Sequence, residues 1–187
     1  TITTASKSAF ITALYVVIVP LIAAVGERVR LRVSSIFAAL LAAAGVYLLT
    51  SPTVSHINLG DWLTLGCAFA FALHILVMEA AAPRHDPVAL NFWQIVFTTA
   101  LCTLAMVPIA RPALPLTFWT ITALLVTGLL ATALAFGVQT WAQRETSATH
   151  AAIAFTGEPV FAALFAGVIQ GAWLGKSGLI GAAMIVG

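Results

Sequence analysis

Long apolar runs, separated by short polar segments, constrain this chain more than any other feature. A helix of about 20 residues crosses the core of a bilayer, which is about 30 Å thick. Asp61 precedes the third run and is the predicted N-cap of its helix. The length of the apolar runs therefore predicts an all-α integral membrane protein, a multi-span helical bundle. Seven runs can be recognised, at about residues 8–25, 35–50, 62–82, 88–110, 118–141, 148–169 and 179–187.

The composition agrees with this class and argues against others. Hydrophobic residues make up 61% of the chain and charged residues only 7%, whereas soluble domains carry about 25% charged residues. The charges stand mostly between the apolar runs, so we expect a lipid bilayer and no nucleic acid as a partner. The sequence has no Cys/His metal spacing, no phosphate-binding glycine loop and no Gly-x-Ser-x-Gly motif. We expect no catalytic residues, no metal and no cofactor.

Glu158 is the most informative single residue. It lies near the middle of the run 148–169, directly before Pro159, which cannot donate a hydrogen bond to the Phe155 carbonyl. A carboxyl group at membrane depth is costly, and broken helices form the binding sites of many secondary transporters. We expect Glu158 to lie at the centre of a binding or coupling site. The simpler alternative is a protonated Glu158 that bonds to a neighbouring backbone carbonyl.

Two segments resemble each other at an offset of 143 residues. Residues 3–9, Thr-Thr-Ala-Ser-Lys-Ser-Ala, resemble residues 146–152, Thr-Ser-Ala-Thr-His-Ala-Ala. Each copy leads into an apolar run with a proline, and Pro20 is the second predicted helix break. The offset places Tyr15 opposite Glu158. Because consecutive runs cross in alternate directions, the two copies enter the membrane from opposite sides, as in the inverted repeats of secondary transporters.

Positively charged residues predict the orientation of the runs, since they collect on the cytoplasmic side of a membrane protein. The loops on one side contain more of them than the loops on the other side. The first side is therefore predicted to be cytoplasmic, with Arg28, Arg30, Arg32, Arg84 and Arg144 against Lys7, Arg111 and Lys176.

Several stretches resemble the EamA-type branch of the drug/metabolite transporter superfamily. They are residues 8–20 followed by Gly26-Glu27-Arg28, residues 139–149, the stretch Glu158-Pro-Val-Phe-Ala-Ala-Leu164, and residues 180–184. The resemblance implies ten spans in two inverted five-helix repeats, with both ends in the cytoplasm. This chain would supply the fourth to tenth spans. Residues 171–173, Gly-Ala-Trp, depart from the Gly-Glu-Arg that such proteins commonly show at that place.

The resemblance also implies a division of the chain and a function. Residues 1–50 would be the last two spans of a truncated first repeat, 51–60 a linker, and 61–187 a second repeat with a truncated last span. The whole protein would be a multi-pass secondary transporter in the cell (inner) membrane. Its substrate would be a small organic metabolite such as an amino acid, exported by alternating access, with a proton as candidate coupling ion. We expect the chain to be part of a longer protein and not to transport alone.

Other polar residues inside the runs are candidates for the same site. His74 could carry a proton or bind an anion, or be a neutral histidine that donates to a neighbouring helix. Gln94 and Gln139 favour either a bundle interior or a water-filled cavity. Thr12 and Tyr15, three residues apart on one helix face, either line the cavity or pack in the core.

Two other classes of function stay open at this point. His74 and Glu158 would be the acid/base pair of an intramembrane enzyme if they lie within hydrogen-bond reach, directly or through one water. A seven-helix receptor is suggested only by the number of runs. The inverted repeat argues against the receptor.

Overall fold

The computed structural model describes residues 4–27, 33–51, 57–106, 115–171 and 173–186. It confirms the predicted multi-span helical bundle. A shorter apolar helix, Lys176–Val186, corresponds to the seventh run. Residues 107–110 of the predicted fourth span lie outside the described residues, as do Arg28, Arg30, Arg32 and Arg111, which weight the predicted orientation. Six helical segments of the described chain are long and apolar enough to cross a membrane: Ser6–Val25, Val33–Thr50, Leu59–Arg84, Pro87–Met106, Phe118–Ala142 and Ala148–Ile169.

The chain divides into two compact units, residues 1–77 with 147–187, and residues 78–146. The helix α4 (Leu59–Ala81) begins in the first unit and ends in the second. The other helices of the first unit are α1 (Ala5–Ala13), α2 (Tyr15–Glu27), α3 (Val33–Thr50), α8 (Ala148–Phe155), α9 (Glu158–Gln170) and α10 (Lys176–Val186). The second unit contains η1 (Ala82–Arg84), α5 (Pro87–Met106), α6 (Phe118–Leu125), η2 (Val126–Leu134) and α7 (Ala135–Ala142).

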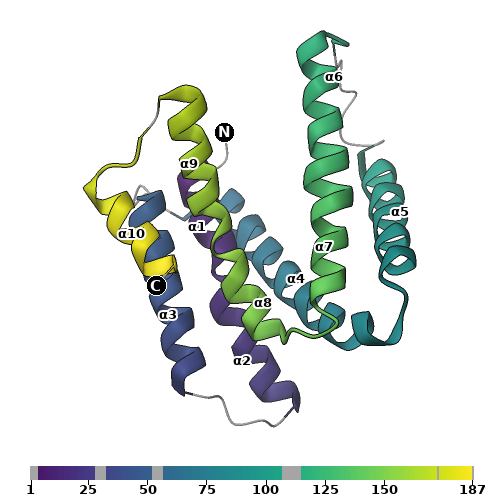
Figure 1. Ribbon diagram of the computed structural model, residues 1–187, viewed down its shortest axis with the longest axis horizontal. Helices are drawn as coiled ribbons and strands as arrows, with labels where there is room; N and C mark the ends of the chain where they lie inside the picture. The colour runs from purple at the N-terminus through teal and green to yellow at the C-terminus, as the bar shows by residue number, and fades with distance from the viewer. Residues whose placement is uncertain (1–3, 28–32, 52–56, 107–114, 172, 187) are drawn as a thin grey trace. The chain divides into compact units, whose positions relative to one another are not determined.

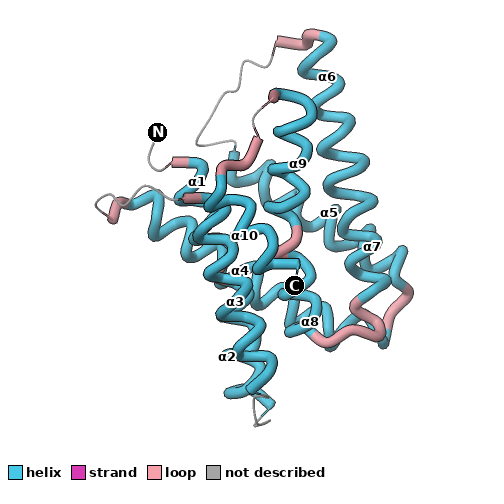
Figure 2. The backbone as a smooth tube through the Cα atoms, turned by 60° about the vertical axis from the view of Figure 1, so that its left-hand side comes forward, coloured by secondary structure: helices cyan, strands magenta, loops and turns pink. Residues whose placement is uncertain are grey.

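Helices of the first unit run in opposite directions. Figures 1 and 2 show that α1 and α2 follow one another in one direction, whereas α8 and α9 follow one another in the other. The helix α3 packs against α10, and α2 packs against both α3 and α8. Segments from the two ends of the chain therefore build one unit.

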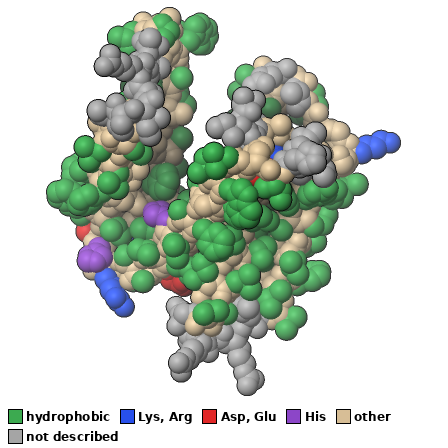
Figure 3. All heavy atoms as spheres, turned by 180° about the vertical axis from the view of Figure 1, so that it is seen from behind, with side chains coloured by type: hydrophobic (Ala, Val, Ile, Leu, Met, Phe, Trp, Pro, Cys, Tyr) green, Lys and Arg blue, Asp and Glu red, His purple; other side chains and the backbone are tan. Residues whose placement is uncertain are grey.

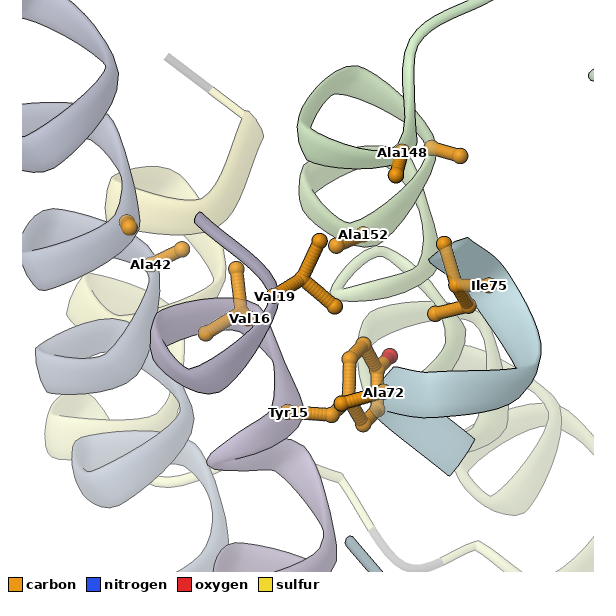
Figure 4. Close-up of a cluster of buried hydrophobic side chains, with 10 residues drawn as sticks. Tyr15, Val16, Val19, Ala42, Ala72, Ile75, Ala148 and Ala152 are labelled. Atoms are coloured by element: carbon orange, nitrogen blue, oxygen red, sulfur yellow. The ribbon is translucent and has the colours of Figure 1, made fainter. Parts of the chain in front are cut away.

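Small and β-branched side chains fill the core of this unit (Figure 4). Val16 and Val19 of α2 are fully buried, and Figure 4 shows Val19 between the helices that carry Ala42 and Ala152. Tyr15 lies beside Ala72 of α4. Alanines at such contacts let helix backbones approach closely, which is how helices associate in a bilayer without a hydrophobic driving force.

The backbones of α3 and α10 approach each other closely at Gly45 and Gly181. A Cβ added to Gly45 would lie 2.8 Å from the Gly181 carbonyl oxygen. A Cβ added to Gly181 would meet the Gly45 carbonyl oxygen, and it would lie 2.7 Å from the amide nitrogen of Leu49. Only glycine fits at these two positions unless the helices move apart.

Two of the spans are broken near mid-length. One residue, Leu14, separates α1 from α2, and two residues, Thr156 and Gly157, separate α8 from α9. The second break directly precedes Pro159. The first break lies at Leu14 and not at the predicted Pro20, because α2 continues through that proline. A proline crowds the carbonyl four residues before it, which for Pro20 is that of Val16 within α2, so Pro20 does not account for the break at Leu14.

The two broken spans begin and break at equivalent positions of the sequence offset. The N-cap hydroxyl of Thr4 accepts from the amide of Lys7, and that of Ser147 accepts from the amide of His150. Both pairs are 143 residues apart. The same offset relates the first residues of α1 and α8, of α2 and α9, and of α3 and α10. The weak sequence resemblance therefore coincides with shared local structure.

A buried ion pair connects α1 with the start of α4. The Nζ atom of Lys7 lies 2.6 Å from Oδ2 of Asp61, and their side chains are 12% and 4% exposed. Asp61 is not the N-cap that the sequence predicted. Asn58 takes that place, since its Oδ1 accepts from the Asp61 amide (3.0 Å) and the Asp61 carboxylate accepts from the Asn58 amide (2.9 Å). This reciprocal pattern is a capping box, which begins α4 at Leu59, inside the predicted linker 51–60.

Hydrophobic side chains cover much of the face shown in Figure 3, and charged side chains are few. None of the most apolar part of α5 or of the span Phe118–Ala142 is buried within the chain. A surface of this kind suits contact with lipid or with further apolar protein.

Replacing Gly181 with alanine should destabilise the protein, because its Cβ would meet the Gly45 carbonyl. The overlap should cost about 1–3 kcal/mol of unfolding free energy, measured by denaturation in detergent micelles. Gly66→Ala is the matched control, because a Cβ at Gly66 meets nothing within 4 Å and alanine is the better helix former. Equal stability of the two variants would contradict the close crossing.

Lys7→Met and Asp61→Asn should each lower the unfolding free energy more than Lys176→Met, a change at an exposed lysine. Removing one partner of a buried ion pair costs about 3–5 kcal/mol, because a charge stays behind without its partner. The double variant should therefore lose less than the sum of the two single losses. Strictly additive losses in a double-mutant cycle would show that the two side chains are not coupled.

Candidate functional site

A pocket of about 530 Å³ lies in the first unit, where the two broken spans meet. Its walls come from α1 and the start of α2, from the end of α3 and from the start of α9. Among the described residues that line it, Glu158 is the only one with a charge. The lining residues are Ser8, Ala9, Thr12, Ala13, Tyr15, Leu49, Thr50, Glu158, Pro159, Ala162 and Ala163.

Three of the predicted site residues, Thr12, Tyr15 and Glu158, share this pocket. Glu158 is midway along its span, and Tyr15 is midway along the span Ser6–Val25. The two side chains are close enough for the Glu158 carboxylate to act electrostatically on the Tyr15 hydroxyl. The pocket therefore reaches the depth at which the bilayer is most apolar.

Glu158 is exposed to the pocket and not enclosed by protein. Within the part of the chain that the structure describes, its carboxyl group forms no hydrogen bond or ion pair. The alternative of a protonated Glu158 bonded to a backbone carbonyl finds no such bond among these residues. Glu158 also stands in the first turn of α9, where the helix dipole favours a negative charge.

Two further hydroxyl groups line the pocket near the start of α1 and the end of α3. Thr50 Oγ1 donates to the Val46 carbonyl at 2.8 Å. Ser8 Oγ contacts Thr64 Oγ1 at 3.5 Å, and Thr64 Oγ1 in turn donates to the Gly60 carbonyl at 2.7 Å. Sequence reasoning missed Ser8 and Thr50, because each lies near a span end and only the fold brings it to Glu158.

His74 is placed beside the aromatic wall behind Tyr15 and does not line the pocket. Its ring stacks on Phe71, with ring centroids 6.1 Å apart and 12° between the planes. Phe71 packs edge-on against Tyr15 at 4.9 Å and lies 6.1 Å from Phe155. His74 is thus connected with the pocket through one aromatic ring.

Gln94 of α5 and Gln139 of α7 belong to the second unit and do not line the pocket. Gln94 Nε2 donates to Asn91 Oδ1 and to Thr140 Oγ1, both at 3.1 Å. Gln139 Nε2 donates to Gln143 Oε1 at 3.0 Å, and Gln139, Thr140 and Gln143 are buried. The bond from Gln94 to Thr140 joins α5 to α7, and hydrogen bonds between helices stabilise membrane bundles.

The span that contains Gln139 also has an unexpected backbone form. The nine residues of η2 are a π-helix. This form is rare in proteins as a whole, but it occurs frequently at functional sites. The Ala133 carbonyl within it accepts from Asn91 Nδ2 at 3.0 Å. No residue pattern in the sequence predicts a π-helix. Asn91, a polar residue in an apolar run, could have been added to the predicted site residues.

The described residues contain no group of three His, Cys, Asp or Glu side chains that could hold a metal ion. The pocket itself presents one carboxylate, several hydroxyls and an apolar wall. Such a site can bind a small polar molecule or exchange a proton.

Comparisons with known proteins agree with this architecture. A model of the EamA-like transporter family matches residues 58–187. An uncharacterized transporter from Archaeoglobus fulgidus is 32% identical over 163 residues, which cover 87% of this chain and 52% of that protein. The chain therefore spans about half the length of that curated relative.

A protein known from its crystal structure has the same fold, with a TM-score of 0.84 and 17% sequence identity. The similarity covers 99% of this chain and 66% of that chain. The family model matches more than half of this chain and includes the helix with Glu158. The resemblance seen in the sequence is thereby confirmed, and the chain belongs to the EamA-like transporter family.

Proposed function

We propose that the intact protein is a secondary transporter that exports small organic metabolites, such as amino acids, across the cytoplasmic membrane. The family makes this chain part of a multi-pass membrane transporter. The observation that carries the finer proposal is the pocket of about 530 Å³, which has the Glu158 carboxylate and the Tyr15 hydroxyl at mid-depth and further hydroxyls toward its rim. A site of this size suits a small molecule.

The arrangement of the broken spans supports alternating access. Secondary transporters with inverted repeats bind their substrates near the midplane, between broken helices of the two repeats. Here two broken spans, α1–α2 and α8–α9, run in opposite directions and both line the pocket. Rocking of one broken span against the other would change the side from which the pocket is reached.

Glu158 is the group that would couple transport to a second event. A carboxylate at this depth is tolerated while the pocket holds water or a positively charged partner, and a protonated carboxyl is tolerated when the pocket is closed. Exchange between these two states would connect substrate movement with proton movement. Tyr15 and Thr12 would hold the substrate beside Glu158.

The Lys7–Asp61 ion pair lies next to the rim of the pocket, since Ser8 follows Lys7 directly and lines the pocket. In the predicted orientation this rim faces the side opposite the cytoplasm. The pair would hold the ends of α1 and α4 together when that side of the pocket is closed.

The enzyme alternative gains no support from the geometry. No hydrogen bond joins His74 and Glu158 within the described residues, and His74 is not among the residues that line the pocket. The receptor alternative has only the number of spans behind it, and family membership favours transport.

Glu158→Gln should abolish gradient-driven transport while leaving the fold intact. The intact protein would be placed in proteoliposomes loaded with mixed amino acids and nucleosides, and efflux followed with and without a pH gradient. Loss of a charged hydrogen-bonding partner should slow efflux by roughly 10-fold or more. The dependence on the pH gradient should disappear in the variant.

Glu145→Gln is the matched control, because this glutamate is exposed in the turn before α8 and loses the same charge. It should transport like the wild type. Efflux and pH dependence that are unchanged in Glu158→Gln would remove Glu158 from the coupling mechanism. Absence of any efflux by the wild type would contradict the proposed substrate class.

A further inference from the structure

We infer that the Glu158 pocket recognises its substrate through a protonated amino group, which pairs with the Glu158 carboxylate. The inference rests on the proposed function, because it names the chemical class that the transport site takes. Two observations carry it. The hydroxyls around the pocket are placed as hydrogen-bond acceptors, and several backbone amides at the start of α9 already donate to carbonyls.

The hydroxyl groups of Ser8 and Thr50, at the rim of the pocket, are placed to accept hydrogen bonds from a ligand. Thr50 commits its single hydroxyl proton to the Val46 carbonyl. Thr64 commits its proton to the Gly60 carbonyl, so the contact between Thr64 and Ser8 requires Ser8 to be the donor. In this arrangement the oxygens of Ser8 and Thr50 are left as acceptors for a ligand.

The remaining polar groups of the pocket add more acceptors. Glu158 contributes a carboxylate, which accepts only. The hydroxyls of Thr12 and Tyr15 make no hydrogen bond within the described residues, so each can either accept or donate. An ammonium group has three donors and no acceptor, which matches a set of acceptors around one negative charge.

The start of α9 could have offered an anion site, but three of the amides there already donate to backbone carbonyls. Helix N-termini bind anions through free backbone amides. At the start of α9, the amides of Val160 and Phe161 both donate to the Gly157 carbonyl, at 3.0 and 3.1 Å, and the Gly157 amide donates to Ala154. Pro159 has no amide hydrogen. A carboxylate would find few donors here and would face the charge of Glu158.

The lysine that precedes Ser8 is already paired with a carboxylate. Lys7 precedes Ser8 in the sequence, and its Nζ atom is bound to the Asp61 carboxylate at 2.6 Å. No Lys, Arg or His is found among the described residues that line the pocket. Four alanines also line the pocket, so a short apolar group next to the ammonium group would fit.

Binding of three probes of equal chain length tests the inference on the purified intact protein in detergent. Butylammonium, butyrate and butanol would be titrated by calorimetry at neutral pH. Butylammonium should bind at least roughly 10-fold more tightly than either other probe, since a hydrogen-bonded charge pair is worth that much. Glu158→Gln should weaken butylammonium binding by roughly 10- to 100-fold.

Thr50→Val removes one acceptor and should weaken butylammonium binding by roughly 2- to 10-fold. Thr103→Val is the matched control, because Thr103 Oγ1 makes the same bond to a carbonyl four residues earlier, 2.7 Å from Thr99, on a helix that does not line the pocket. Thr50→Ser should restore the affinity. Butyrate that binds as tightly as butylammonium would overturn the inference, as would equal affinities of Thr50→Val and Thr103→Val.

The same data separate this inference from the proposed function. Glu158-dependent binding of butylammonium without gradient-driven efflux of any metabolite would contradict the transporter and support the ammonium site. Efflux of anionic metabolites only, with no butylammonium binding, would support the transporter and overturn the ammonium site.

Discussion

The core of a bilayer offers no water to backbone polar groups, and this constraint explains most of the structure. Regular helices satisfy their own amides and carbonyls, so a helix that breaks at mid-depth must be surrounded by protein or line a cavity. This chain breaks two of its spans there, at Leu14 and at Thr156–Gly157. Both breaks lie beside the pocket that contains the Glu158 carboxylate, so the backbone is irregular where a polar ligand can be bound.

The rest of the first unit holds the two broken spans in place. The crossing of α3 and α10 at Gly45 and Gly181 leaves no space between the backbones. The core around Val16 and Val19 fixes α2 between its neighbours. At the rim, the Lys7–Asp61 pair adds a charged connection that a membrane protein keeps only where both partners are shielded and bonded.

The sequence could predict the spans well, because twenty-residue apolar runs have few structural solutions. It also pointed to Glu158 and to the 143-residue offset, at which three pairs of helices begin. The break at Leu14 could not be predicted, since leucine carries no local signal. The ion pair of Lys7 and Asp61 could not be predicted either, because the two residues are far apart in the sequence. The site was predicted in part. Thr12, Tyr15 and Glu158 share one pocket, whereas His74 lies behind it and Gln94 and Gln139 lie in the second unit.

The central claim is that water and a polar ligand reach Glu158 at mid-depth, and thiol labelling tests it most directly. The two native cysteines would be replaced in the variants Cys67→Ser and Cys102→Ser, and Thr12→Cys would then be exposed to a membrane-impermeant thiol reagent in intact proteoliposomes. A pocket open to water predicts labelling of Thr12→Cys, slowed when the transported ligand is added. No labelling from either side of the membrane, under conditions that label a cysteine placed at the exposed residue Glu145, would contradict the account.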